Sequence, residues 1–249
     1  MRVVRIYHDE DVRYGLADDT TVTLISDEPF AAWEAEGAVP LAGAHLLSPA
    51  VPTKVVCVGV NYRAHAEEMG HQVPDEPIIF LKPPTAVIGH GAEIRIPANL
   101  TEVDYEAELG IVLGRRTRAI SAAEAPAHIL GYVCANDVTS RVLQRKDGQW
   151  TRAKGFDTFC PLGPWVQTDL DPQDLAIESY VNGELRQSGR TSDMIVPPFE
   201  LVSFVSRVMT LLPGDVVLTG TPAGIGPMVR GDTVEVRIEG IGSLINHVV

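Results

Sequence analysis

Short apolar runs separated by glycine and proline follow one another along the chain from Lys54 onward. Helical periodicity is rarer in this region than the alternation of apolar and polar residues that is typical of strands. The pattern therefore predicts a β-rich α+β main body, with strands in the segments 55–60, 78–82, 103–114, 131–137 and 215–220.

Three segments carry helix signals. The capping box Ser121-Ala-Ala-Glu124 predicts a helix start, and a second helix is expected after Pro198, in F-E-L-V-S-F-V-S-R-V-M. The segment 61–69, N-Y-R-A-H-A-E-E-M, predicts a third. The turn residues Asn182-Gly183, between two strand patterns, predict a β-hairpin.

The first fifty residues have a different texture. Strand patterns occur at Arg2–Tyr7 and Thr20–Ile25, with no long apolar run between them. A brief helical stretch is expected at Phe30–Glu36. This part ends in Ser-Pro-Ala-Val-Pro, a proline-rich exit typical of a domain boundary. We therefore expect a small N-terminal domain, residues 1–50, and a main domain, residues 51–249.

A chain of 249 residues can bury one large core, or one core plus a small module. Its 33 acidic residues outnumber the 20 Lys and Arg, and the net charge of −13 argues against a nucleic-acid partner. An anionic substrate would need local cations, for which Lys82, Arg141 and Lys154 are candidates.

The cysteines Cys57, Cys134 and Cys160 are odd in number and far apart, which predicts buried free thiols in a reducing compartment. No signal-peptide pattern opens the chain, and no apolar run of membrane-spanning length occurs. We expect a cytoplasmic protein with no membrane partner.

The most informative polar feature is a pair of acids. Glu106 and Glu108 lie two residues apart in a run whose alternate positions are apolar, so both should project from one strand face. Unpaired like charges at this separation cost free energy in a partly dry site, which a divalent cation would offset. Asp137 ends another apolar run and could be a third ligand. Three oxygen ligands without a Cys or His cluster indicate Mg²⁺, Mn²⁺ or Ca²⁺.

A plainer interpretation is that this strand face points into water. It would also explain Glu102 and Asp104, which have the same parity, because half-exposed strands often carry acids. The pair Asn136-Asp137 is likewise common in turns. The spacing alone leaves both interpretations open.

His65 and Glu68 are three residues apart, so on a helix they share a face and could form a general acid/base pair. They follow a strand, where catalytic groups often lie, and Gly70 could act as a hinge or helix stop. The alternative is a solvated helix turn with an incidental ion pair.

Other polar residues could serve an anionic substrate. Lys154, next to Gly155, could be partly buried and aimed at an anion, or be a surface lysine. Thr221, in T-G-T-P, could help to hold a carboxylate or simply belong to a turn. Arg141 and Gln144 could bind a second substrate carboxylate, or begin an exposed helix.

Seven motifs occur in one order between about Lys54 and the C-terminus. They read G-V-N-Y-x-x-H-x-x-E, I-I-F-L-K-P, Y-E-A-E-L, N-D-V-T-S-R-x-x-Q, K-G-F-D, V-N-G-E-L-R-Q and L-T-G-T-P-x-G-I-G. In this order they resemble the fumarylacetoacetate hydrolase family. The resemblance implies a mixed β-roll as the catalytic domain, a small N-terminal domain and a homodimer.

The resemblance also implies roles for individual residues. Glu106, Glu108 and Asp137 match the family's ligands for Mg²⁺ or Mn²⁺, and Lys154 matches its active-site lysine. His65 and Glu68 match a dyad carried on a lid that orders when ligand binds. Lys82, Arg141, Gln144 and Thr221 match positions that line the substrate pocket. Val142 stands where the family usually has Asp, a departure that puts in doubt the local helix contacts and the rim of the substrate pocket but none of the three ligands.

By this resemblance the metal would act as an electron sink for the enolate of a small 2-oxo acid. Retention of His65 and Glu68 favours C–C bond cleavage, either acylpyruvate hydrolysis or oxaloacetate-type decarboxylation. Isomerisation of a 2-hydroxy-dienedioate is the alternative. From other classes, a metal-dependent ligand-binding protein without catalysis and an acid cluster without a metal stay open.

Overall fold

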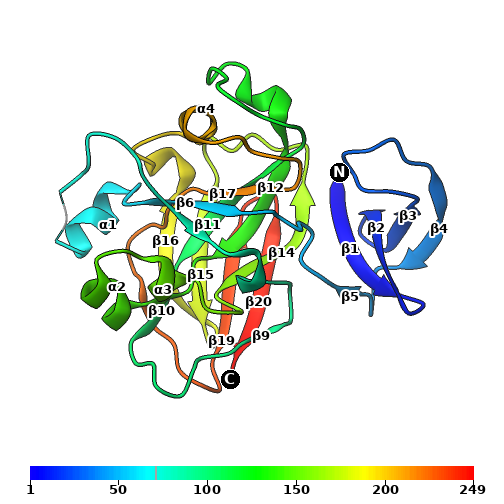
Figure 1. Ribbon diagram of the computed structural model, residues 1–249. Helices are drawn as coiled ribbons and strands as arrows, with labels where there is room; N and C mark the ends of the chain where they lie inside the picture. The colour runs from blue at the N-terminus through cyan, green and yellow to red at the C-terminus, as the bar shows by residue number, and fades with distance from the viewer. Residues whose placement is uncertain (71) are drawn as a thin grey trace.

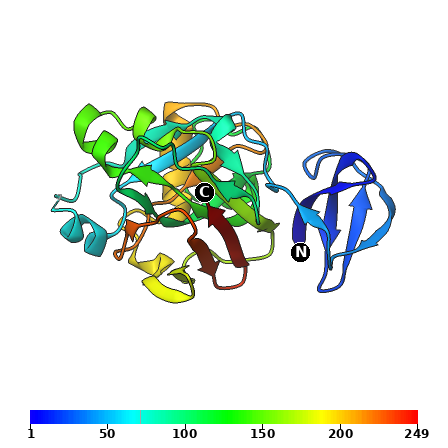
Figure 2. The ribbon, with the colours of Figure 1, turned by 90° about the horizontal axis from the view of Figure 1, so that it is seen from below.

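The computed structural model describes residues 1–70 and 72–249 (Figure 1). Strands make up most of the regular structure, and the helices are few and short, as predicted for a β-rich α+β protein. Figures 1 and 2 show a large main body and a small N-terminal lobe to one side of it. None of the described helices is long and apolar enough to cross a membrane.

In the described part of the chain, the largest sheet contains twelve strands and runs through both the body and the lobe. Its members are β1 (Arg2–His8), β2 (Asp11–Ala17), β3 (Thr21–Ile25), β4 (Ala35–Pro40), β5 (His45–Leu46), β6 (Val55–Gly59), β7 (Ile78–Lys82), β8 (Val87–Ile88), β11 (Ala107–Leu113), β12 (Ile129–Asn136), β14 (Cys160–Gln167) and β17 (Val216–Leu218). The main order is β4-β3-β2-β1-β14-β12-β11-β17-β6-β7. Because β17–β6 and β14–β8 are parallel and the other pairs antiparallel, the sheet is mixed.

Two smaller sheets complete the main body. One contains β9 (Glu93–Ile94), β15 (Ala176–Val181), β16 (Glu184–Arg190), β19 (Thr233–Ile238) and β20 (Gly242–Val248), in the order β16-β15-β19-β20-β9. The other contains β10 (Val103–Tyr105), β13 (Thr139–Ser140) and β18 (Gly226–Pro227). The predicted hairpin is confirmed as β15–β16, with Asn182 and Gly183 at positive φ as a two-residue type I′ turn requires.

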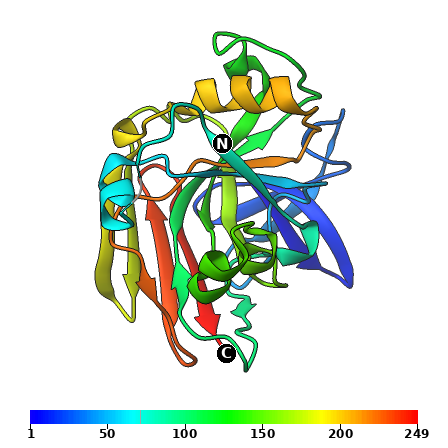
Figure 3. The same cartoon turned by 60° about the vertical axis from the view of Figure 1, so that its left-hand side comes forward.

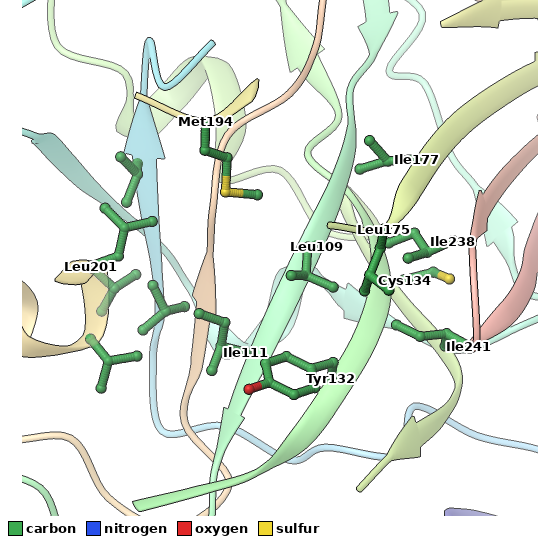
Figure 4. Close-up of a cluster of buried hydrophobic side chains, with 14 of the residues drawn as sticks. Leu109, Ile111, Tyr132, Cys134, Leu175, Ile177, Met194, Leu201, Ile238 and Ile241 are labelled. Carbon is green, nitrogen blue, oxygen red and sulfur yellow. The ribbon is translucent and has the colours of Figure 1, made fainter. Parts of the chain in front are cut away.

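The main core lies where the central strands pack against the five-stranded sheet and against the helix Pro198–Val208, which contributes Leu201 (Figure 4). Leu109 and Ile111 on β11 meet Ile177 and Ile238 there, and all are buried. The opposite face of β11 contributes Val112 to a second apolar core. Because both faces of this strand are covered, a polar side chain on either face lies inside the protein.

Within residues 1–70 and 72–249, four α-helices and three 3₁₀ turns accompany the sheets. They are α1 (Arg63–Glu68), α2 (Arg141–Asp147), α3 (Thr151–Lys154), α4 (Pro198–Val208), η1 (Pro84–Ala86), η2 (Ala125–His128) and η3 (Thr191–Asp193). The predictions of α1 and α4 are confirmed, and Figure 3 shows α4 across the top of the body and α1 at its left edge. A helix start at Arg141 was one of the two interpretations of that segment, and α2, with seven residues, begins there; the sequence patterns did not reveal α3, which has four residues.

Two helix predictions are wrong. Instead of a helix at Phe30–Glu36, β4 begins at Ala35 and pairs with β3, so strand pairing overrides a weak local preference. Only half of the Ser121–Glu124 box forms: the Glu124 carboxylate accepts from the Ser121 amide at 2.8 Å, but the Ser121 hydroxyl donates to the same carboxylate and does not cap the Glu124 amide. The box leads only into the single turn η2, after which the chain extends into β12.

The N-terminal lobe has its own small core, which includes Val4, Ile6, Val22 and Leu24. It joins the body through pairing of β1 with β14, in the register Val3↔Val166. The prediction of buried free thiols is confirmed for all three cysteines.

Candidate active site

Three carboxylates meet where the central strands end. Glu106 lies between β10 and β11, Glu108 lies on β11, and Asp137 directly follows β12. The β11–β12 register brings the segments together, and the Asp137 amide donates to the Glu106 carbonyl at 2.9 Å. One ligand oxygen from each acid lies within 4.8 Å of the others.

These acids do not face water. Glu106, Glu108 and Asp137 are only 4%, 2% and 1% exposed, so the plainer interpretation of an exposed strand face is wrong for them. It is also wrong for Asp104, which is buried, whereas Glu102 is exposed. The cause is the double coverage of β11, which period-two alternation alone does not reveal.

Two buried lysines compensate part of the negative charge. The Lys154 ammonium, at the end of α3, donates to Glu106 Oε2 at 2.8 Å and to Asp137 Oδ2 at 2.7 Å. Lys82, on β7, forms an ion pair with Asp137 and donates to the Val138 carbonyl at 3.1 Å. The prediction of a partly buried Lys154 is confirmed, and the lysine is in fact almost fully buried.

Arg141 completes the cationic side of the site. Its Nε donates to Asp104 Oδ2 at 2.7 Å, its Nη1 donates to Gln144 Oε1 at 2.9 Å, and its Nη2 pairs with Glu106. Arg141 is the first residue of α2, but its side chain is buried and not exposed. Asp104, which sequence reasoning did not select, thus fixes the guanidinium beside the acids.

The acids differ in electrostatic environment. Burial raises the pKa of Glu106, but the charges of Lys154 and Arg141 outweigh it and hold the pKa well below the ordinary value. Burial and the neighbouring charges of Asp137 and Glu106 raise the pKa of Glu108 well above its ordinary value. Burial lowers the pKa of Lys154, but Asp137 and Glu106 outweigh it and raise the pKa.

The negative charge on Glu108 is less well compensated than that on Glu106, and this difference fits a bound cation. Among the described residues, Glu108 forms no ion pair and accepts one hydrogen bond, from the Gly220 amide at 2.7 Å. The three candidate ligands are all carboxylate oxygens, which suits a hard ion such as Mg²⁺ or Mn²⁺. Glu106, Glu108 and Asp137 could therefore hold a divalent cation, which would offset the charge on Glu108.

The predicted histidine–glutamate pair is formed on α1. His65 Nδ1 lies 3.1 Å from Glu68 Oε2, and His65 is buried whereas Glu68 is exposed. The other oxygen of Glu68 accepts from the Gly224 amide at 3.0 Å. One carboxylate therefore contacts both the imidazole and the loop after Thr221.

The chain between β6 and α1 is tightly held. Val60 has a φ of +57°, a strained conformation for a β-branched residue. Next to it, Asn61 donates to the carbonyls of Val196 and Thr219 at 3.0 and 2.8 Å. These contacts stabilise the exit that places His65 at the site.

Gln187, on β16, is a fully buried residue that sequence reasoning did not single out. Its side-chain oxygen accepts from the amide of Ala107, between the two glutamates, at 2.9 Å. Its nitrogen donates to Thr221 Oγ1 at 2.7 Å and to the Pro222 carbonyl at 2.8 Å. Gln187 is the last residue of the motif V-N-G-E-L-R-Q, and this motif was the available sequence signal for it. Its hydrogen-bond partner Ala107, however, is 80 residues away.

One cavity collects most of the predicted residues. Lys82 is not on its wall but beneath Asp137, and Glu68 lies behind His65. The predicted residues on the wall are His65, Glu106, Glu108, Asp137, Arg141, Gln144, Lys154 and Thr221. Further lining comes from Val58, Gly59, Val60, Met69, Phe80, Trp150 and Gly220, none of which was selected from the sequence for a role in the site.

Comparison with known families agrees with this arrangement. The family described as fumarylacetoacetate (FAA) hydrolase C-terminal matches residues 54–249. The chain belongs to the fumarylacetoacetate hydrolase family. A second family, described as Rv2993c-like, N-terminal, matches residues 1–49.

Named relatives in this family are enzymes. The chain is 47% identical to oxaloacetate tautomerase FAHD2B, mitochondrial, of Bos taurus over 210 residues, which cover 80% of this chain and 67% of the relative. The crystal structure of 2-hydroxyhepta-2,4-diene-1,7-dioate isomerase from Mycobacterium marinum is 48% identical with a TM-score of 0.93, covering 100% of this chain and 98% of that one.

A third relative was solved with a metal. Fumarylpyruvate hydrolase from Pseudomonas aeruginosa, in complex with Mn²⁺ and pyruvate, is 37% identical with a TM-score of 0.74. The match covers 79% of this chain and 89% of that one. The three relatives thus include a tautomerase, an isomerase and a hydrolase.

Proposed function

We propose that this chain is an Mg²⁺- or Mn²⁺-dependent enzyme that converts a small 2-oxo acid through its enolate. The observation that carries the proposal is the buried triad Glu106, Glu108 and Asp137, which lines one cavity with Lys154 and His65. A divalent cation on the triad would supply the Lewis acidity that stabilises enolate charge.

Lys154 supplies a fixed positive charge next to the triad. Its side chain is 3% exposed, and its ammonium is held by three acceptors, Glu106, Asp137 and Thr139, so it needs little reorganisation as negative charge develops on the substrate. Arg141 and Gln144 line the same cavity and provide N–H donors for a second carboxylate of the substrate.

His65 is the candidate for proton transfer at carbon 3 of the 2-oxo acid. With Glu68 accepting the Nδ1 proton, the Nε2 nitrogen is left to take a proton from carbon and to return it. A buried imidazole on the cavity wall is suited to this role because bulk water does not compete for the proton.

Proton transfer without C–C cleavage is the outcome we place first. It is favoured by the tautomerase and the isomerase, which are 47% and 48% identical to this chain. The second candidate is the C–C cleavage expected from the sequence, either acylpyruvate hydrolysis or oxaloacetate-type decarboxylation. The fumarylpyruvate hydrolase, 37% identical, supports it, and the same enolate serves both outcomes. We propose that the enzyme acts as a homodimer.

The test follows the enol of oxaloacetate by ultraviolet absorbance and any pyruvate formed by NMR. We expect Mg²⁺-dependent loss of enol, abolished by EDTA and strongly reduced in His65→Ala, with His45→Ala as a matched control on the exposed lobe. Pyruvate released at the same rate would favour cleavage instead. A metal-loaded protein that binds oxalate but converts no 2-oxo acid would favour the non-catalytic binding protein.

A further inference from the structure

The cavity has two unlike walls. One carries the acids, Lys154 and Arg141, and the other is apolar, with Phe80 on β7, Trp150 between α2 and α3, and Met69 after α1. These three apolar residues are partly exposed, so they offer contact surface to a ligand. They come from segments far apart in the sequence, and the fold brings all three to one cavity.

The indole of Trp150 is closely seated in this wall. A Cβ atom at Gly59 would lie 2.6 Å from its Cζ3 and 2.9 Å from its Cη2, so only glycine leaves room for the ring. On another side, Phe80 packs edge-on with ring centroids 5.2 Å apart at 73°. Contacts with β6 and β7 therefore fix the position of the Trp150 ring in the apolar wall.

The same contacts connect the apolar wall to the charged one. The Lys154 ammonium lies 4.9 Å from the centroid of the Phe80 ring, within cation–π distance. The Trp150 carbonyl accepts from the Lys154 amide at 3.0 Å in the turn that begins α3. The indole is thus held at a set position relative to the amine beside the acids.

We propose that Trp150 is the specificity-determining residue of this site. Given the proposed function, the indole limits the length of the substrate beyond its 2-oxo acid group and packs against the carbon chain. The indole carries no charge, whereas the Arg141 guanidinium does, so a second carboxylate should turn towards Arg141 and Gln144. The substrate class is therefore a short 2-oxo acid whose carbon chain lies on the indole, and bulky aryl tails are excluded.

The experiment compares kcat/KM for acetylpyruvate and benzoylpyruvate, two probes that differ only in the tail. We expect Trp150→Ala to raise kcat/KM for benzoylpyruvate relative to kcat/KM for acetylpyruvate by about tenfold or more, because removing the indole makes room for the phenyl tail. Trp150→Phe should shift this ratio less. Trp33→Ala, on the N-terminal lobe, is the control and should leave it unchanged. Equal loss for both probes in Trp150→Ala would assign the indole a structural role and overturn the inference.

A binding readout separates this inference from the proposed function. In a Trp33→Phe, Trp165→Phe protein, Trp150 is the remaining tryptophan, and its emission should change when oxalate is added with Mg²⁺. If wild type converts no 2-oxo acid, the proposed function fails. The inference is then tested by measuring the dissociation constants of acetylpyruvate and benzoylpyruvate. The ratio of these two constants must still change in Trp150→Ala.

Discussion

The acids of the site lie at the ends of long central strands, whereas the histidine lies on a helix of six residues. Glu106, Glu108 and Asp137 are buried and share hydrogen bonds and ion pairs with strands and helices far apart in the sequence. The helix α1 is short, and its Glu68 is exposed.

This difference indicates that the acids and the helix α1 have separate roles. The strand-borne acids are organised before any ligand arrives, which suits cation binding and charge stabilisation. The short helix can move with less disruption of the core, which suits a group that must approach substrate and leave it. Changes in the two regions should therefore have separable effects.

The largest effect is expected for Asp137→Ala. It leaves Lys82 buried with only the Val138 carbonyl among its described partners, and breaking a buried ion pair costs about 3–5 kcal/mol. Urea unfolding should show this loss, and calorimetry should show no Mn²⁺ binding. Asp169→Ala removes an exposed partner of the N-terminal amine and should leave both properties unchanged. Wild-type stability in Asp137→Ala would contradict the assigned ion pair.

His65→Ala should act on rate alone. Loss of a general base lowers kcat by roughly 10²–10⁴-fold, while Mn²⁺ affinity and the unfolding midpoint stay close to those of wild type. Steady-state kinetics and calorimetry on one preparation test this. If the metal affinity fell together with kcat, the two regions would not be separable.

Glu108→Gln tests whether the negative charge on Glu108 destabilises the metal-free protein. Because folding raises the pKa of Glu108, its ionisation costs stability as pH rises above the ordinary glutamate range. The metal-free variant should therefore melt at a higher temperature than wild type at neutral pH, and the gain should vanish at a pH low enough to protonate Glu108 in both states. Mn²⁺ should raise the midpoint of wild type but not of the variant. A lower midpoint for the metal-free variant at neutral pH would rule out this cost.

The smallest effect is expected for Glu68→Gln. The amide oxygen can still accept from the Gly224 amide, but the charge beside His65 is lost. We expect kcat to fall about tenfold, corresponding to roughly 1.4 kcal/mol, with unchanged Mn²⁺ affinity. Glu67→Gln, exposed on the same helix, is the matched control. An equal fall in that control would point to a general effect on α1.

Sequence patterns predicted the strand-rich fold, the hairpin at Asn182-Gly183 and the helix after Pro198 because these depend on local periodicity and turn chemistry. Period-two spacing also placed Glu106 and Glu108 together. It did not show that they are buried, since burial depends on what packs against each face of β11. The failure at Phe30–Glu36 has the same origin, because pairing with β3 decided that segment.

Contacts across long sequence separations could not be read from the sequence. The pairing of Arg141 with Asp104, the bridge made by Gln187 and the seat of Trp150 over Gly59 all depend on strand register and sheet curvature. The ordered motifs supplied the ligand set, but not which wall each residue would occupy. The roles assigned to these residues remain predictions.

Exchange of the methyl protons of pyruvate in D₂O, followed by ¹H NMR, tests enolate formation most directly, because it does not depend on any later step. With Mg²⁺ we predict exchange well above the enzyme-free rate, abolished by EDTA and lost in Glu108→Gln and His65→Ala. Exchange at the enzyme-free rate, or exchange unaffected by EDTA, would contradict a metal-assisted enolate at Glu106, Glu108 and Asp137.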